Sequence, residues 1–194
     1  MNNIEGDIVE CGVWRGGSMM IIASVLMALG DTSRSLYLYD TYQGMSEPSD
    51  DDVDFAGNAA STRLLEMAQS KENWCEASLE DVQTNLFSTG YPSNKIHFIK
   101  GKVEETIPAT IPQRLALLRL DTDWYESTKH ELTHLYPLLN SSGILIIDDY
   151  GHWQGAKKAV DEFFKDSQIF LHRIDYTARL IVKPVGEQGR GANA

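Results

Sequence analysis

Short apolar runs that end in polar or acidic residues alternate along the chain with segments whose apolar residues recur at the period of a helix. The runs span residues 8–11, 36–40, 96–99, 115–121, 143–148, 169–171 and 178–182. The clearest helical segments cover residues 18–29 and 156–164. This alternation is typical of a parallel sheet that is covered by helices. We therefore predict an α/β fold with a seven-stranded, mostly parallel sheet and helices on both faces.

Length, charge and cysteine content indicate the number of domains, the kinds of partner and the cellular setting. The 194 residues suit one domain, expected over residues 1–185, with residues 186–194 as a disordered tail. The 17 basic and 28 acidic residues give a formal charge of −11, which disfavours nucleic acid and anionic membranes as partners. Cys11 and Cys75 lie far apart, and the chain shows neither a leader pattern nor a run long enough to span a bilayer. A reduced, cytoplasmic setting is expected.

A glycine-rich turn follows the first predicted strand over residues 10–18, with the sequence ECGVWRGGS. Glycines let the backbone approach a ligand, and the N-terminus of the following helix offers free N–H groups to an anionic or carboxylate-bearing ligand. Trp14 stands where a dinucleotide fingerprint needs glycine, so a nicotinamide cofactor is disfavoured. The pattern E-x-G-x-x-x-G-x-S is that of class I methyltransferases, whose turn wraps the methionine part of S-adenosylmethionine. The alternative is a turn needed only for packing.

Two later positions add to the case for a nucleoside cofactor. Asp40 ends the second predicted strand, where an acidic side chain accepts hydrogen bonds from ribose hydroxyls in sheets of this kind. An aspartate there can equally cap the following turn. The segment 101–106, which includes Val103, follows the third strand at a place that often contacts adenine in class I methyltransferases.

Four aspartates follow two neighbouring strands of the predicted sheet. Asp121 and Asp123 stand two apart at the end of the fourth strand, so a strand that continues through both would project them from one face. Asp148 and Asp149 end the fifth strand at the same edge. Carboxylates this close raise one another's pKa unless a cation neutralises them, so a hard divalent metal such as Mg²⁺ is the economical explanation. The alternative is that these aspartates cap turns or helices.

Aromatic and acidic segments surround these carboxylates. Aromatic walls with a few polar groups suit a polyhydroxylated or aromatic small molecule, and the candidate contacts are Trp124, Tyr125, Tyr150 and His152. His152 is either such a contact, an auxiliary acid or base, or a surface histidine. The irregular segment 43–59 carries five acidic residues and is interpreted either as a solvated acidic loop or as a lid at the ligand-binding edge.

Four segments, at residues 9–18, 39–45, 118–128 and 147–153, together resemble the macrocin O-methyltransferase family of metal-dependent sugar O-methyltransferases from antibiotic biosynthesis. The resemblance runs from about residue 6 to 183 and implies a Rossmann-like class I methyltransferase fold with S-adenosylmethionine and Mg²⁺ as cofactors. It implies that Asp121, Asp148 and Asp149 hold the metal and that Asp123 is the general base, with Asp121 also catalytic. The residues that it places around S-adenosylmethionine are Glu10, Gly12, Trp14, Arg15, Gly16, Ser18, Asp40, Val103 and Asp121.

The implied function is therefore methyl transfer to a hydroxyl of a small molecule, a sugar of a natural product. Family members usually carry a helical segment before the first strand that helps to cover the acceptor site, whereas here that strand starts about six residues from Met1. A non-catalytic cofactor-binding module of a larger biosynthetic protein is the main alternative, and an uncovered apolar edge is compatible with a homodimer. A metal-dependent hydrolase or phosphotransferase ranks third, because the chain lacks a G-x-x-x-x-G-K-[ST] phosphate loop.

Overall fold

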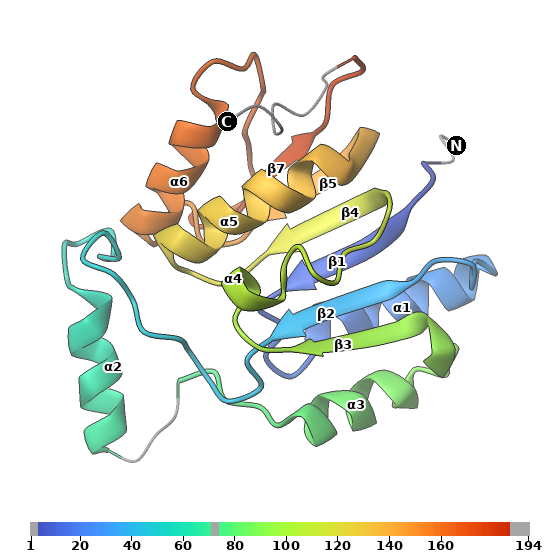
Figure 1. The fold of residues 1–194 in the computed structure, drawn as a ribbon, viewed down its shortest axis with the longest axis horizontal. Coiled ribbons are helices and arrows are strands. Elements are labelled where there is room, and N and C mark those ends of the chain that lie inside the picture. The colour runs from blue at the N-terminus through green and yellow to red at the C-terminus, as the bar shows by residue number, and fades with distance from the viewer. Residues whose placement is uncertain (1–3, 71–73, 187–194) are drawn as a thin grey trace.

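The computed structural model describes residues 4–70 and 74–186 as a seven-stranded sheet with the order β3-β2-β1-β4-β5-β7-β6 (Figure 1). The strands are β1 Asp7–Cys11, β2 Leu36–Asp40, β3 Ile96–Lys100, β4 Leu115–Leu120, β5 Leu139–Ile147, β6 His172–Arg173 and β7 Arg179–Val182. The first five strands run parallel, whereas β7 is antiparallel to both β5 and β6. The predicted α/β fold is confirmed, and the predicted tail lies, except for residue 186, outside the described residues.

Helices cover both faces of the sheet (Figure 1). They are α1 Gly17–Leu29, α2 Ala60–Gln69, α3 Leu79–Ser88, α4 Val103–Thr106, α5 Tyr125–Leu135 and α6 Gln154–Phe164, with 3-10 turns at Ser93–Lys95 and Tyr136–Leu138. Side chains of β1 alternate between two cores, because Ile8 packs with α1 and α3 while Val9 packs with α5 and α6. None of the helices in the described residues is long and apolar enough to cross a bilayer.

The order of the strands determines where a ligand can bind. The chain leaves β1 toward β2 on one side and returns to β4 on the other side of β1. A crevice opens at the carboxyl ends of the strands wherever the order reverses in this way. The ends of β1, β2 and β4 carry the glycine-rich turn, Asp40 and Asp121 respectively, so the topology brings these three features to one edge of the sheet.

The predicted strand at residues 169–171 is wrong, because the edge strand that pairs with β7 consists of His172 and Arg173. Ile169 and Leu171 are apolar because they pack against the core and not because they pair with a strand. The fourth strand ends at Leu120, one residue earlier than expected, and the fifth begins at Leu139. The earlier end of β4 affects the carboxylates, because it leaves Asp121 just beyond the strand.

Candidate active site

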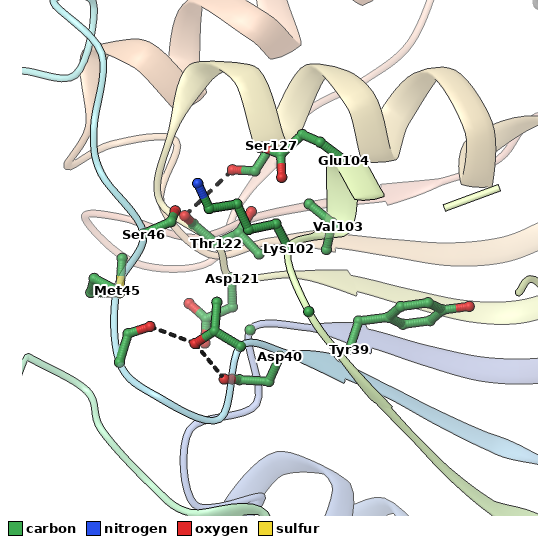
Figure 2. A pocket seen from close by; sticks show the side chains of 14 residues that line it. Tyr39, Asp40, Met45, Ser46, Lys102, Val103, Glu104, Asp121, Thr122 and Ser127 are labelled. Atoms are coloured by element: carbon green, nitrogen blue, oxygen red, sulfur yellow. Dashed lines mark hydrogen bonds between the residues drawn. The ribbon is translucent and has the colours of Figure 1, made fainter. Parts of the chain in front are cut away.

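A cleft lies at the carboxyl ends of β1, β2 and β4, with about 430 Å³ of empty space that is partly open to solvent (Figure 2). Its lining residues are Gly12, Tyr39, Asp40, Thr41, Gly44, Met45, Ser46, Gly101, Lys102, Val103, Glu104, Asp121, Thr122 and Ser127. Four of the residues predicted to surround a nucleoside cofactor meet here, namely Gly12, Asp40, Val103 and Asp121. The others lie outside the lining of this cleft.

Asp40 fastens the glycine-rich turn to the end of β2. Its Oδ2 accepts hydrogen bonds from the backbone N–H groups of Val13, at 2.8 Å, and Trp14, at 3.1 Å. Its Oδ1 accepts a hydrogen bond of 2.7 Å from the backbone N–H of Tyr42. The carboxylate therefore caps the turn as the alternative interpretation supposed, and it also lines the cleft where the cofactor was expected.

Two glycines of the turn lie where the surrounding atoms leave no room for a Cβ. Gly12 has a φ of 77°, and a Cβ there would lie 2.0 Å from the backbone oxygen of Asp121. Gly16 has a φ of 80°, and a Cβ there would lie 2.6 Å from Leu86 of α3. Packing therefore accounts for both glycines, although Gly12 also lines the cleft.

The remaining predicted cofactor residues point elsewhere or lie beneath the cleft. Trp14 is 55% exposed, and Arg15 forms an ion pair of 3.0 Å with Asp81 of α3. Ser18 is half-buried in the first turn of α1. Glu10 is buried, and its Oε1 accepts a hydrogen bond of 2.7 Å from Arg119. Burial raises the pKa of Glu10 to about 7, although Arg119 favours the charged form.

Three carboxylates converge beside the cleft. Asp121, Asp123 and Asp149 each offer an oxygen, and these oxygens lie within 4.8 Å of one another. The expectation that one strand face carries Asp121 and Asp123 is wrong, because β4 ends at Leu120 and the backbone turns at Asp123 with a φ of 68°. Burial, followed by repulsion between the neighbouring carboxylates, raises the pKa of all three. Such a group favours either proton sharing or a bound cation.

Arg119 connects this cluster to Glu10 and Asp148 by hydrogen bonds. The sequence did not predict a role for this arginine. Its guanidinium donates to Glu10 at 2.7 Å, to Asp121 at 2.6 Å and to Asp148 at 2.9 Å. Asp148 therefore lies beside the cluster and shares Arg119 with Asp121. The available signal was a single arginine inside the apolar run LALLRL of a buried strand, a position that needs a counter-charge.

Tryptophans pack behind the carboxylates. Trp74, Trp124 and Trp153 form a buried cluster with ring centroids 5.1–5.8 Å apart. The indole N–H of Trp153 donates to Oδ2 of Asp123 at 3.1 Å, whereas that of Trp124 donates to the backbone oxygen of Ser46 at 3.0 Å. Trp153 is thus a direct neighbour of the carboxylate cluster, and the sequence placed it only in the surrounding aromatic wall.

The four predicted substrate contacts fall into two groups. Trp124 and Tyr125 are buried, and the hydroxyl of Tyr125 donates to Glu162 at 2.8 Å. Tyr150 and His152 line a second, open cleft. Only the second pair is accessible to a ligand.

The acidic segment after β2 is not simply solvated. Asp52 is 1% exposed, and its carboxylate accepts hydrogen bonds of 2.7 Å from the backbone N–H groups of Tyr125 and Ser49. Asp54 forms a bridge with Trp153. The interpretation of residues 43–59 as a solvated loop is therefore wrong for Asp52, which helps to attach the segment to the start of α5.

Comparisons with known proteins agree with this architecture. The family described as macrocin O-methyltransferase (TylF) matches residues 1–182. Demethyldecarbamoylnovobiocin O-methyltransferase of Streptomyces niveus is 36% identical over 163 residues, which are 84% of this chain and 59% of that protein. A second relative comes from Streptomyces olivaceus and is named 8-demethyl-8-(2,3-dimethoxy-alpha-L-rhamnosyl)-tetracenomycin-C 4'-O-methyltransferase. It is 39% identical over 150 residues, which are 77% of this chain and 54% of that protein.

The solved structure of the O-methyltransferase NovP superposes with a TM-score of 0.81 and 31% identity, covering 94% of this chain and 74% of that one. The chain thus spans between half and three-fifths of the length of the two curated relatives above. The four sequence segments, the sheet topology and these matches lead to one conclusion. The chain belongs to the macrocin O-methyltransferase family.

Proposed function

We propose that the chain transfers a methyl group from S-adenosylmethionine to a hydroxyl of a small molecule, a sugar of a natural product, with the help of a divalent cation such as Mg²⁺. The observation that carries the proposal is the double position of Asp121, which lines the first cleft and belongs to the carboxylate cluster. A cofactor in this cleft would therefore lie beside the groups that handle the acceptor hydroxyl. A cytoplasmic location belongs to the same proposal, since Cys11 and Cys75 are both free thiols.

The first cleft fits the cofactor. Asp40 and Gly12 lie at the strand ends where this fold places ribose and the methionine part, and Val103 covers the position expected for adenine. Bound there, S-adenosylmethionine would supply an activated methyl group. The sequence-derived roles of Glu10, Trp14, Arg15, Gly16 and Ser18 become indirect in this proposal, since these residues shape the turn or lie below it.

The carboxylate cluster fits a hard cation, because its donors are oxygen atoms and burial holds their negative charges close together. Following the family resemblance, we assign the cation to Asp121 and Asp149 of the cluster and to Asp148 beside it, which leaves Asp123 to act on the acceptor. A bound divalent cation would lower the pKa of a neighbouring hydroxyl. Arg119 holds one oxygen each of Asp121 and Asp148, which fixes the orientation of both carboxylates.

Asp123 is the residue proposed to take the proton. The N–H of Trp153 fixes its Oδ2, so the carboxylate has one orientation toward the cluster. Burial and then the neighbouring Asp121 raise its pKa when no cation is bound. The proposed cation would favour the ionised carboxylate, which is the form that can accept a proton from an acceptor hydroxyl.

Titration calorimetry and a transfer assay test the proposal. The wild-type protein is expected to bind S-adenosylmethionine and Mg²⁺ and to methylate at least one member of a panel of glycosides and phenols, as detected by mass spectrometry. Asp149→Asn is expected to weaken Mg²⁺ binding, whereas Asp50→Asn, an exposed aspartate of the acidic segment, is the matched control. Failure to bind the cofactor would overturn the proposal, and binding without transfer to any acceptor would favour the non-catalytic module.

A further inference from the structure

A second cleft opens at the start of α6, with about 950 Å³ of empty space that is partly open to solvent. Its lining residues are Phe55, Tyr150, Gly151, His152, Trp153, Gln154, Lys157, Lys158, Asp161 and Glu162. They come from the segment after β2, from the segment after β5 and from α6.

Hydrogen bonds hold the walls of this cleft in place. The backbone N–H of Gln154 donates to the oxygen of Val53 at 2.8 Å, and its side-chain amide donates to the oxygen of Asp54 at 3.0 Å. The N–H of Gly151 donates to the oxygen of Thr177 at 2.8 Å, and a Cβ on Gly151 would lie 1.9 Å from the oxygen of Tyr176. Residues 151–154 therefore fasten both the Phe55 segment and the Tyr176 segment.

Two aromatic rings, those of Phe55 and the half-buried His152, line the cleft, and the ring of Tyr176 packs beside both of them. Phe55 is 65% exposed and Tyr176 is 56% exposed, and their ring centroids lie 6.3 Å apart. His152 lies 5.5 Å from Phe55 and 6.0 Å from Tyr176, and its Nδ1 shares a hydrogen bond of 2.9 Å with the hydroxyl of Tyr176. Anchored rings that stay exposed are a contact surface for a ligand with an apolar face.

The second cleft is linked to the proposed chemistry through Trp153. This residue lines the cleft, and its indole N–H holds Asp123. Asp121 of the same cluster lines the first cleft. The first cleft thus touches the cluster through Asp121, and the second cleft is joined to it through the hydrogen bond between Trp153 and Asp123.

The charges around the second cleft balance. Lys157 and Asp161 form an ion pair, Lys158 pairs with Asp51 at 2.8 Å, and Glu162 accepts from the hydroxyl of Tyr125. Two lysines and two acids line the cleft, so it has no net preference for a charged ligand. Aromatic faces beside paired polar groups fit a neutral ring that has an apolar C–H face and several hydroxyls.

We infer that the second cleft binds the sugar ring of the methyl acceptor, with Phe55, His152 and Tyr176 as the aromatic platform. The inference rests on the proposed function and adds the acceptor subsite to it. Phe55 and Tyr176 are new contacts, while the buried side chains of Trp124 and Tyr125 no longer count as contacts. Specificity for the acceptor would then depend on two loops, one before α2 and one before β7.

The inference can be tested by measuring the binding of methyl α-L-rhamnopyranoside to the full chain with saturation-transfer NMR. The wild-type protein is expected to saturate the C–H protons of the sugar. Phe55→Ala and Tyr176→Ala are each expected to raise the Kd by about 2- to 10-fold, the effect of one lost aromatic contact. Phe55→Tyr keeps an aromatic ring at this position, so its Kd is expected to stay close to that of the wild type. Phe170→Ala, at an exposed phenylalanine outside this cleft, is the matched control.

The outcomes separate this inference from the proposed function. An absence of sugar binding in the wild type, or equal Kd values in wild type, Phe55→Ala and Tyr176→Ala, would overturn the inference. For any acceptor that the wild type methylates, both alanine variants are expected to raise KM with an unchanged Kd for S-adenosylmethionine. Sugar binding that depends on Phe55, in a protein that methylates nothing, would support the cleft and contradict the proposed function.

Discussion

The carboxylate of Asp123 accepts a hydrogen bond from the indole N–H of Trp153, a member of the buried tryptophan cluster. Trp153→Phe keeps a ring in the cluster but removes this donor. We expect kcat to fall by about 10-fold or more, because a hydrogen bond to a charged group contributes about 1.5–3 kcal/mol. The Kd for S-adenosylmethionine should stay the same. Steady-state kinetics would measure the first quantity and calorimetry the second.

Trp74→Phe is the matched control, since Trp74 belongs to the same cluster and packs 5.8 Å from Trp153. Equal losses of kcat in the two variants would mean that packing, and not the hydrogen bond to Asp123, explains the effect.

The roles of Asp123 and Asp148 can be separated by one pair of variants. The proposal assigns proton removal to Asp123 and cation binding to Asp148, although Asp123 lies in the converging group and Asp148 beside it. We expect Asp123→Asn to lower kcat by about 100-fold or more while Mg²⁺ affinity changes little. Asp148→Asn should mainly weaken Mg²⁺ binding. The reverse pattern in calorimetry and kinetics would exchange the two assignments.

Glu131 of α5 gives a prediction about pH. It is fully buried, Thr122 donates to its Oε1 at 3.0 Å, and its Oε2 has no hydrogen-bond partner among the described residues. Burial raises its pKa well above the ordinary value of 4.5, so the folded state binds this proton more tightly than the unfolded state. That contribution to stability is complete below the unfolded pKa and declines as the pH rises toward the folded pKa.

Glu131→Gln replaces the titrating carboxyl group with an amide that does not titrate in this range. The free energy of unfolding of the variant should therefore rise relative to that of the wild type by about 1.4 kcal/mol for each pH unit between about 5 and the folded pKa of Glu131. Urea unfolding at several pH values would measure the difference. Parallel dependence of the two unfolding free energies on pH would contradict the prediction.

The sequence predicted that aspartates meet at one edge of the sheet but not which other residues they contact. Asp121, Asp123 and Asp149 were found because parallel strands end at one edge of a sheet. Arg119 was missed because its role depends on register, which places it beside Glu10 across β1 and β4. The turn at Asp123 was missed too, since a positive φ at a non-glycine residue has no clear sequence pattern.

At the scale of elements, the start of α5 depends on a carboxylate from another segment. Asp52 accepts from the N–H of Tyr125, the first residue of α5, and also from the N–H and hydroxyl of Ser49. We expect Asp52→Ala to lower the free energy of unfolding by about 1–3 kcal/mol, because buried donors lose their acceptor. Asp50→Ala, at an exposed position of the same segment, should change it little. Chemical denaturation would compare the two variants.

Elements with a strong period were predictable, whereas elements whose form depends on tertiary contacts were not. The first three strands matched closely because each is a short apolar run bounded by polar residues. The two-residue strand β6 has no period of its own and forms only through pairing with β7. The burial of Asp52 likewise followed from a contact between residues 73 positions apart, which no local pattern reveals.

For the whole molecule, the formal charge of −11 has a local consequence, because part of it is concentrated at the carboxylate cluster. Burial, together with repulsion between the carboxylates, raises the pKa values of Asp121 and Asp149 and destabilises the charged folded state, and a bound cation would relieve the repulsion. A ligand that binds only the folded state stabilises it by RT ln(1 + [L]/Kd), or about 2.7 kcal/mol at a hundredfold excess over Kd. The Tm should therefore rise with the logarithm of Mg²⁺ concentration.

Screening of the overall charge would also raise the Tm, so the two effects must be separated. Screening depends on ionic strength alone, and NaCl matched in ionic strength to the Mg²⁺ series reproduces it without occupying a carboxylate site. We expect Mg²⁺ to raise the Tm beyond this NaCl control in the wild type and in Asp50→Asn. Asp149→Asn should show a smaller excess of the Mg²⁺ response over the NaCl response, because a neutral amide replaces one proposed carboxylate donor. An equal response of the wild type to the two salts, measured by scanning fluorimetry, would mean that the cluster is stabilised by shared protons and Arg119 and not by a cation.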